Sequence, residues 1–350
     1  MKKFVGLFLF TFALLNNLCS SEKTNDFHTL QGKKTKNWDY VLKSDINFLE
    51  KYKDLYLANG ASDVKLNKIP KFIHFIWIGP KDFPSNSIKN VISWVEKHPA
   101  YEVCFWSDRD RPLPHPEMKF RKVQDFNWGY LEDLYHDSDN YAEKADLLRY
   151  EILFQEGGIY VDHDVECYKP FDKFVSGYDL FCGLEPLHAP LGSTAVEACN
   201  NLIGACPSHP ILKKAIELSQ KNWEYYKNAY QGSDVGSVTK RVYFRTFCSF
   251  SEAVHQMVFD SNFRNIVLPA GFFNKIEGNF GVYAHHFYDS TWFESETQFE
   301  KNVRKRLLKI CRKNNQVMLI VSVFFIILTF VIICLFLQIR LLRKHIEKKN

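Results

Sequence analysis

Several signatures of common protein classes are missing from this chain of 350 residues. It has no Gly-x-Gly-x-x-Gly and no P-loop motif, so it lacks the usual marks of dinucleotide-binding and ATP-binding proteins. None of its nine cysteines forms a Cys-x-x-Cys pair, which argues against a zinc site and leaves a disulfide framework open. There is no Asn-x-Ser/Thr sequon, which argues against a heavily glycosylated luminal protein, and no internal repeat.

What is present is an ordinary globular composition with two unusual ends. Hydrophobic residues make up 46% of the chain and charged residues 24%. The formal charge of +5 is concentrated near the C-terminus. We therefore expect a membrane as a partner and no nucleic acid. Residues 1–21 begin with Lys2 and Lys3 before a short apolar run, the pattern of a signal peptide or signal anchor.

The second unusual end is the uncharged run 317–337, whose 21 residues can span a bilayer as a single C-terminal transmembrane helix. A basic juxtamembrane segment, 301–316, precedes it, and a basic tail, 338–350, follows. The flanking charges favour a cytoplasmic globular part, whereas the N-terminal segment favours export. We expect a luminal or extracytoplasmic location, in the Golgi or another endomembrane if the cell is eukaryotic, with the cytoplasmic side as the alternative.

Between these ends we expect a helical lead-in over 22–68 and a globular α/β domain over 69–300. The run 71–78 is too apolar for a half-exposed strand and is typical of a central parallel strand. With the helix and strand that follow, it makes a βαβ unit. The expected strands are 71–78, 101–106 and 159–161, and the expected helices are 43–57, 86–97, 142–156 and 210–226. The helix at 142–156 should bury one apolar stripe and stop at Gly157.

Two aspartates, Asp162 and Asp164, follow the strand 159–161 directly. On an extended segment residues i and i+2 point the same way, so the two carboxylates would share a face and repel each other. A cation with a preference for oxygen ligands, Mn²⁺ or Mg²⁺, would relieve this repulsion and could also neutralise a diphosphate leaving group. The alternative is a solvated strand end with turn-favouring aspartates.

Other polar and aromatic groups fall where open α/β sheets bind ligands, at the carboxyl ends of strands. Trp77 follows the first expected strand and Asp108 the second. Asp146 and Arg149 lie three residues apart and share one helix face, either to hold a sugar or only as a buried ion pair. Of the adjacent late histidines only one can face the site, and we favour His286 as a metal ligand.

The segment Ile69–Gly79, the helix with Asp146 and Arg149, and the run Gly157–Asp164 together resemble the DxD sugar-binding region of the family 32 glycosyltransferases. That family includes mannosyltransferases of the initiating and the inositol-phosphorylceramide type. The segments are more distantly similar to the catalytic domain of the large clostridial glucosylating toxins. The resemblance implies a GT-A type, Rossmann-like nucleotide-sugar-binding fold and transfer with retention at the anomeric carbon.

The resemblance also implies roles for single residues. Asp146, Arg149, Asp162 and Asp164 are the expected catalytic residues, with Asp146 and Arg149 on the sugar and Asp162 on ribose and sugar hydroxyls. The donor site would add Trp77, stacked on the base, with Tyr160 and Trp292. The expected metal ligands are Asp164, Asp162, His286 and Ser290. Thr291 separates Ser290 from Trp292, which are adjacent in many members of the family.

We therefore expect a membrane-anchored, metal-dependent retaining glycosyltransferase with a nucleotide-sugar donor and a lipid or glycan acceptor. The narrowest expectation is transfer of mannose from GDP-mannose to a glycolipid such as inositol phosphorylceramide. The alternatives are a glucosyl- or galactosyltransferase that uses a UDP-hexose on a glycan or protein, and a non-catalytic membrane-anchored carbohydrate-binding protein. A glycosidase fits poorly, because its two carboxyl groups must flank the scissile bond.

Overall fold

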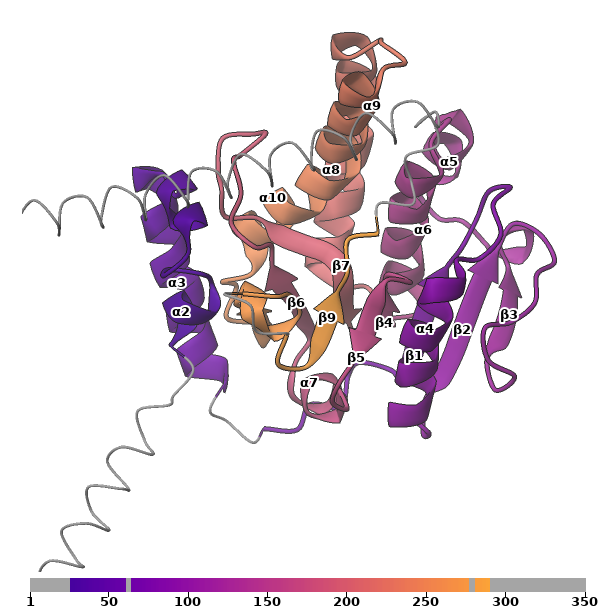
Figure 1. Ribbon diagram of the computed structural model, residues 1–350, viewed down its shortest axis with the longest axis horizontal. Helices are drawn as coiled ribbons and strands as arrows, with labels where there is room; N and C mark the ends of the chain where they lie inside the picture. The colour runs from indigo at the N-terminus through magenta and orange to yellow at the C-terminus, as the bar shows by residue number, and fades with distance from the viewer. Residues whose placement is uncertain (1–25, 61–63, 277–280, 290–350) are drawn as a thin grey trace, which may run out of the picture. The chain divides into compact units, whose positions relative to one another are not determined.

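A seven-stranded sheet organises the part of the chain that the computed structural model describes, residues 26–60, 64–276 and 281–289 (Figure 1). In spatial order its strands are β3 (Lys119–Lys122), β2 (Glu102–Ser107), β1 (Phe72–Ile76), β4 (Gly158–Val161), β7 (Ala198–Ala205), β6 (Leu180–Leu184) and β8 (Asn265–Leu268). Neighbouring strands run parallel except at β7, which is antiparallel to both β4 and β6. The predicted α/β class is confirmed. The strand order reverses between β1 and β4, the kind of switch point where such sheets bind ligands.

Helices cover both faces of this sheet (Figure 1). They are α2 (Phe27–Leu30), α3 (Lys43–Gly60), α4 (Ser85–Lys97), α5 (Glu132–Asp137), α6 (Tyr141–Gln155), α7 (Asp172–Gly177), α8 (Pro210–Ala229), α9 (Val235–Val242) and α10 (Cys248–Met257). Short turns of 3₁₀ helix are η1 (Lys36–Tyr40), η2 (Val123–Asp125) and η4 (Ala270–Phe272), and η3 (Tyr243–Phe247) is π-helical. One hydrophobic cluster includes Trp94 of α4, and the other includes the apolar side chains of α6, α8 and α10.

The central position predicted for the strand at 71–78 is confirmed. β1 pairs in parallel with β2 on one side and β4 on the other. Its side chains alternate between the two hydrophobic clusters, with Ile73 and Phe75 in one and Ile76 in the other. The predicted βαβ unit is β1, α4 and β2. Such a strand has no solvent-facing side, which explains its nearly continuous apolar sequence.

Helix α6 begins and ends where the sequence predicts but is buried more fully. Asn140 caps it by accepting from the backbone N–H groups of Ala142 and Glu143, and Gly157 ends it with a φ of +69°. The predicted apolar stripe of Ala145, Leu148 and Ile152 packs in the hydrophobic core, but Leu147 and Tyr150 on other faces of the helix are fully buried as well. The helix is enclosed by the sheet, α8 and η3, so nearly every side of it is covered.

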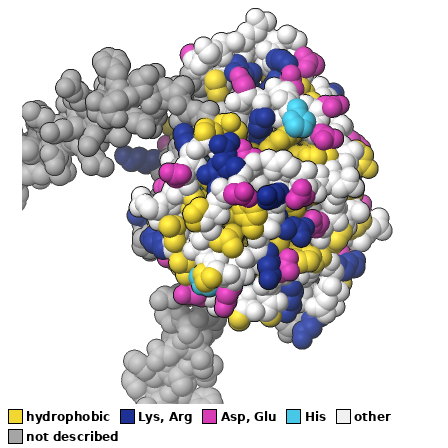
Figure 2. Space-filling view, turned by 90° about the vertical axis from the view of Figure 1, so that its right-hand side faces the viewer, with side chains coloured by type: hydrophobic (Ala, Val, Ile, Leu, Met, Phe, Trp, Pro, Cys, Tyr) yellow, Lys and Arg dark blue, Asp and Glu magenta, His cyan; other side chains and the backbone are white. Residues whose placement is uncertain are grey.

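The two edges of the sheet are protected in different ways. Helix α3 packs along β8, and the Asn59 side chain donates to the Asn265 carbonyl there (2.8 Å). Figure 2 shows the side of the molecule that carries edge strand β3, where basic, acidic and hydrophobic side chains are interspersed. Two of the basic groups on β3 are paired, Arg121 with Glu156 and Lys122 with an aspartate. Charged side chains on an edge strand discourage pairing with another chain.

A second, two-stranded sheet joins segments far apart in the sequence. β5 (Val165–Cys167) pairs antiparallel with β9 (Ala284–His286), with Val165 opposite His286. Among the described helices, none is both long and apolar enough to cross a membrane. The predicted signal segment 1–21 and the predicted span 317–337 lie outside the described residues.

Replacing Gly158 with alanine tests the tight start of β4. Gly158 has a φ of +98°, and an added Cβ would lie 2.9 Å from the Phe72 carbonyl oxygen. We expect Gly158→Ala to lower the free energy of unfolding by about 2–4 kcal/mol. Gly60→Ala, where no atom lies within 4 Å of the new Cβ, should instead be neutral or stabilising by up to about 1 kcal/mol. Urea unfolding of both variants checks this, and equal effects would contradict it.

Burial of His74 in β1 predicts a loss of stability in mild acid. Nδ1 of His74 accepts from the Trp106 indole (3.2 Å), so Nε2 carries the proton and faces the Gly157 carbonyl (3.0 Å). Burial lowers the pKa of His74 to about 4, because the charged ring would lose its water.

In the unfolded chain this imidazole has a pKa of about 6.5, so as the pH falls it binds a proton in the unfolded chain before it does so in the folded protein. Neutral, buried His74 therefore contributes its full share to the stability of the fold above about pH 6.5, and this share is lost as the pH falls towards 4. We expect the His74 share of this loss to be about 2 kcal/mol between pH 7 and pH 5, and His74→Asn to remove it. Urea unfolding at the two pH values measures both, and an unchanged pH dependence in the variant would contradict the assignment.

Candidate functional site

The two aspartates converge through a turn and not along a strand. β4 ends at Val161, and the N–H of Val165 donates to the Asp162 carbonyl (3.1 Å), so the chain turns between the aspartates. The prediction that both sit on extended backbone is therefore wrong. β4 pairs with β7 only as far as Val161, and the chain must then redirect to pair β5 with β9.

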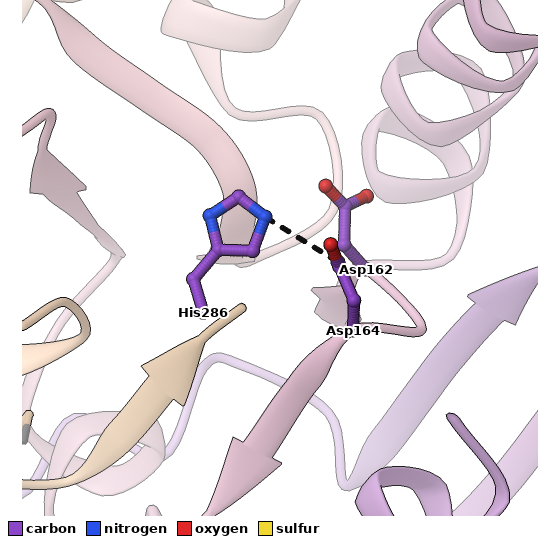
Figure 3. Close-up of side chains that lie close together, drawn as sticks. All are labelled: Asp162, Asp164 and His286. Atoms are coloured by element: carbon purple, nitrogen blue, oxygen red, sulfur yellow. Dashed lines mark ion pairs between the residues drawn. The ribbon is translucent and has the colours of Figure 1, made fainter. Parts of the chain in front are cut away.

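His286 of β9 joins these carboxylates (Figure 3). One ligand atom from each of Asp162, Asp164 and His286 lies within 4.8 Å of the others. His286 Nε2 is 3.3 Å from Asp164 Oδ1, while the other oxygen of Asp164 accepts from the Asp289 N–H (2.8 Å). The choice of His286 over His285 agrees with this geometry, since adjacent residues of β9 point to opposite sides.

The electrostatics of the cluster favour opposite charges on its members. Burial acts to raise the pKa of Asp164, but the hydrogen bond and charge of His286 outweigh it and hold that pKa well below its usual range. Burial likewise acts to lower the pKa of His286, and the bond to Asp164 outweighs it and raises that pKa. Without a cation, an imidazolium would therefore balance the carboxylate.

The residues fit a divalent cation, which would take the place of that imidazolium charge. Two carboxylates and an imidazole make an acceptable ligand set for Mn²⁺. Behind the ring, the Asn201 side-chain nitrogen lies 2.7 Å from His286 Nδ1, and Asn201 Oδ1 is buried with no hydrogen-bond partner. Turning this amide over would let Oδ1 accept from Nδ1–H, which leaves the Nε2 lone pair for a metal. Such outer partners orient most metal-bound histidines.

Arg149 connects helix α6 to the aspartate turn. Its Nη2 lies 2.8 Å from Asp146 Oδ1 and 3.2 Å from Asp162 Oδ1, and its guanidinium stacks over the Tyr160 ring at 4.1 Å. The Tyr160 hydroxyl donates to the same oxygen of Asp162 (2.6 Å). Arg149 and Tyr160 thus orient Asp162. The buried ion pair, one alternative for Asp146 and Arg149, is formed, and their contact with a sugar stays a prediction.

Residues of β7 complete this polar layer, and the sequence reasoning missed them. Asn200 donates to Asp146 (3.0 Å), and its carbonyl accepts from Arg149 (2.5 Å). Asn201 supports His286 as described above. The one available signal was a pair of adjacent asparagines in an otherwise apolar strand, where buried amides need polar partners.

The remaining predicted residues differ in where they lie. Trp77 is 8% exposed, with its ring edge-on to His163 and its indole N–H on the Lys81 carbonyl (2.9 Å). Its stacking on a base stays a prediction. Asp108 holds the turn after β1 by accepting from the Gly79 N–H (3.2 Å). The predicted roles of Ser290 and Trp292 concern positions outside the described residues.

Residues 84–181 match the family model described as "Glycosyltransferase sugar-binding region containing DXD motif". The matched segment contains Asp146, Arg149 and both aspartates of the turn, whereas Trp77 and His286 lie outside it. The resemblance to DxD glycosyltransferases stated from the sequence is confirmed.

Curated relatives share part of their length with this chain. "Subversion of eukaryotic traffic protein A" of Legionella pneumophila is 31% identical over 172 residues, which cover 45% of this chain and 26% of that protein. "Inositol phosphoceramide mannosyltransferase 1" of Schizosaccharomyces pombe is 27% identical over 202 residues, which cover 54% of this chain and 58% of that protein. The chain thus spans between about a quarter and three fifths of these relatives. A solved structure titled "PaToxG Glycosyltransferase" is 22% identical, with a TM-score of 0.41 over 63% of this chain and 80% of that one.

The ion pair of Arg149 can be tested by removing its charge. Arg149→Met leaves the buried Asp146 carboxylate without its cation, and we expect a loss of about 3–5 kcal/mol in the free energy of unfolding. The matched control is Arg109→Met, because Arg109 pairs with Asp108 at the same 2.8 Å while its side chain is 44% exposed. That change should cost less than about 1 kcal/mol. Urea unfolding compares them, and a similar loss in both would rule out a special role for Arg149.

Proposed function

We propose that this chain is a metal-dependent glycosyltransferase that moves a hexose from a nucleotide sugar to an acceptor hydroxyl. The observation that carries the proposal is the convergence of Asp162, Asp164 and His286 beside the switch point of the sheet. Both aspartates lie in the segment that matches the DxD sugar-binding region. A GT-A type fold and retention at the anomeric carbon are part of the proposal and follow from the same resemblance.

The contacts of each side chain suggest its role in the proposed reaction. Asp164 and His286 would hold Mn²⁺ or Mg²⁺, which when bound would neutralise the charge of the departing diphosphate. Asp162, oriented by Arg149 and Tyr160, would accept from ribose and sugar hydroxyls. Arg149 and Asp146 would position the sugar of the donor. Trp77, Ser290 and Trp292 remain proposed donor or metal contacts.

The donor and acceptor are proposed more narrowly from the relatives. The name of the Schizosaccharomyces pombe protein, an inositol phosphoceramide mannosyltransferase, supports mannose as the transferred sugar and a glycolipid acceptor, and the donor that we propose is GDP-mannose. A UDP-hexose donor with a glycan or protein acceptor is the alternative. We also propose attachment to a membrane through 317–337, with the catalytic part on the luminal side, because of the apolar run and the N-terminal segment.

The non-catalytic alternative is a carbohydrate-binding protein on the same fold. Loss of catalysis usually relaxes the demand for a complete site, yet here Arg149 pairs with both Asp146 and Asp162, and Asp164 lies close to Asp162. A donor screen separates the two functions. Purified protein with Mn²⁺ is given GDP-mannose, UDP-glucose or UDP-galactose, with and without a membrane lipid extract, and nucleotide diphosphate release is measured. If no donor is turned over and no nucleotide binds in the presence of Mn²⁺, the proposal that this chain is an enzyme is wrong.

The metal assignment gives a sharper prediction. Asp164→Asn keeps the size of the side chain but removes the charge that would bind the cation, so transfer should fall at least about 100-fold. Circular dichroism should show an unchanged fold. The matched control is Asp54→Asn, the same change at an exposed position of α3, which should keep full activity. Wild-type activity in Asp164→Asn would overturn the assignment.

A further inference from the structure

A pocket of about 630 Å³ borders the candidate cation site and shares His286 with it. Its lining includes Asn37, Glu185, His188, His286, Phe287 and Tyr288. The residues come from η1, from the loop after β6 and from the end of β9, three separate parts of the chain. None of these apart from His286 has a role in the donor site proposed above.

The pocket lies on the opposite flank of the cation site from Trp77. In the sheet, β1 adjoins β4 on one side, and β7 followed by β6 lies on the other. Trp77 follows β1, whereas Glu185 follows β6. A nucleotide sugar placed at the β1 and β4 ends would therefore leave this pocket free. A second molecule in the pocket would meet the sugar next to His286.

The lining suits a ring that carries several hydroxyl groups. Glu185 offers a partly buried carboxylate, whose oxygens accept from the Tyr288 hydroxyl (2.9 Å) and the Cys199 thiol (2.7 Å). A carboxylate has about four acceptor positions, so it can also take a ligand hydroxyl. Phe287 and Tyr288 are 37% and 46% exposed and offer apolar ring surface beside it. Aromatic walls with a few fixed polar groups are typical of small-molecule pockets.

The backbone at Tyr288 is a second, independent observation. Its φ is +56°, a conformation that costs a bulky residue about 1–3 kcal/mol and persists only when neighbours enforce it. The flanking N–H groups of Phe287 and Asp289 both donate to Asp164 (3.0 and 2.8 Å), and the Tyr288 ring lies 3.9 Å from the His286 ring. These contacts hold Tyr288 between the cation site and Glu185 despite its strained backbone.

We propose that this pocket binds the acceptor, a polyhydroxylated ring such as a sugar or a cyclitol. Glu185 accepts a hydrogen bond from an acceptor hydroxyl, and Tyr288 orients Glu185 and packs against the ring. That the ligand is the acceptor rests on the proposed glycosyl transfer, whereas binding of a ring in this pocket does not depend on that reaction. The two can therefore fail separately.

The test uses the full chain in detergent micelles and two separate titrations. Saturation-transfer NMR measures binding of methyl α-D-mannopyranoside and myo-inositol, and ³¹P line broadening measures binding of inorganic phosphate, both without nucleotide. Fluorescence or calorimetry measures Mn²⁺-dependent binding of GDP and UDP. The variants are Glu185→Ala and Tyr288→Phe, with Glu185→Gln to keep the side-chain shape if the alanine variant does not fold. The matched control is Glu252→Gln on the exposed side of α10.

We expect saturation transfer to at least one ring probe, reduced at least fivefold in the Glu185 variants and less in Tyr288→Phe. Glu252→Gln should match the wild type, and nucleotide binding should stay within twofold in all variants. Binding of phosphate alone, no binding of either ring, or equal binding in the Glu185 variants would each overturn the proposal. Absence of Mn²⁺-dependent nucleotide binding would instead contradict the proposed transfer reaction. Even then, loss of ring binding in the pocket variants alone would show that the pocket binds a ring.

Discussion

The contact on which the site depends is the buried Arg149 guanidinium between Asp146 and Asp162. It joins helix α6 to the turn after β4, and thereby fixes where the Asp162 carboxylate of the cation cluster points. Placing three charged groups in a nearly dry layer is costly unless each is paired and hydrogen-bonded. Asn200 supplies bonds to both Asp146 and Arg149, and Tyr160 covers the guanidinium face. These pairings offset the cost of burying the three charges and hold Asp146, Arg149 and Asp162 in one arrangement.

A second constraint acts on the cation cluster from the far end of the chain. The three-residue pairing of β5 with β9 places His286 opposite Val165, one residue from Asp164. This short ladder makes the site discontinuous in sequence, since more than a hundred residues separate its carboxylates from its imidazole. The same segment continues into Phe287–Asp289, whose backbone is tied to Asp164.

The cation cluster has different neighbours on its two sides. Trp77 follows β1 on one side, and the pocket that contains Glu185 lies after β6 on the other. β7, the one strand of the described sheet that runs against its neighbours, lies between β4 and β6 and contributes the two asparagines that support both Arg149 and His286. The two side chains point to opposite faces of β7, Asn200 towards Asp146 and Asn201 towards His286, so each amide has a polar partner although the strand is fully buried.

Much of the first half of the fold could be predicted from sequence. The apolar run at β1, the helical spacing of α4 and the Gly157 stop of α6 are local features, set by side-chain periodicity and by the backbone freedom of glycine. The segment Ile69–Gly79, the helix with Asp146 and Arg149, and the DxD pair together identified a sugar-binding region, because all three lie within about a hundred consecutive positions of the sequence.

The tertiary structure decided what depends on contacts between distant segments. It turned the chain between Asp162 and Asp164, enclosed α6 on nearly all sides, chose His286 through the β5–β9 pairing and brought Asn201, Glu185 and Tyr288 to the cluster. Local sequence specifies which backbone conformations are cheap, but which polar groups meet is set by strand pairing across the sheet and by the need to satisfy every buried charge. For this protein the sequence by itself determined which side chains of the sugar-binding region carry charge, and only the folded chain decided how those side chains meet His286, because that contact depends on the pairing of β5 with β9.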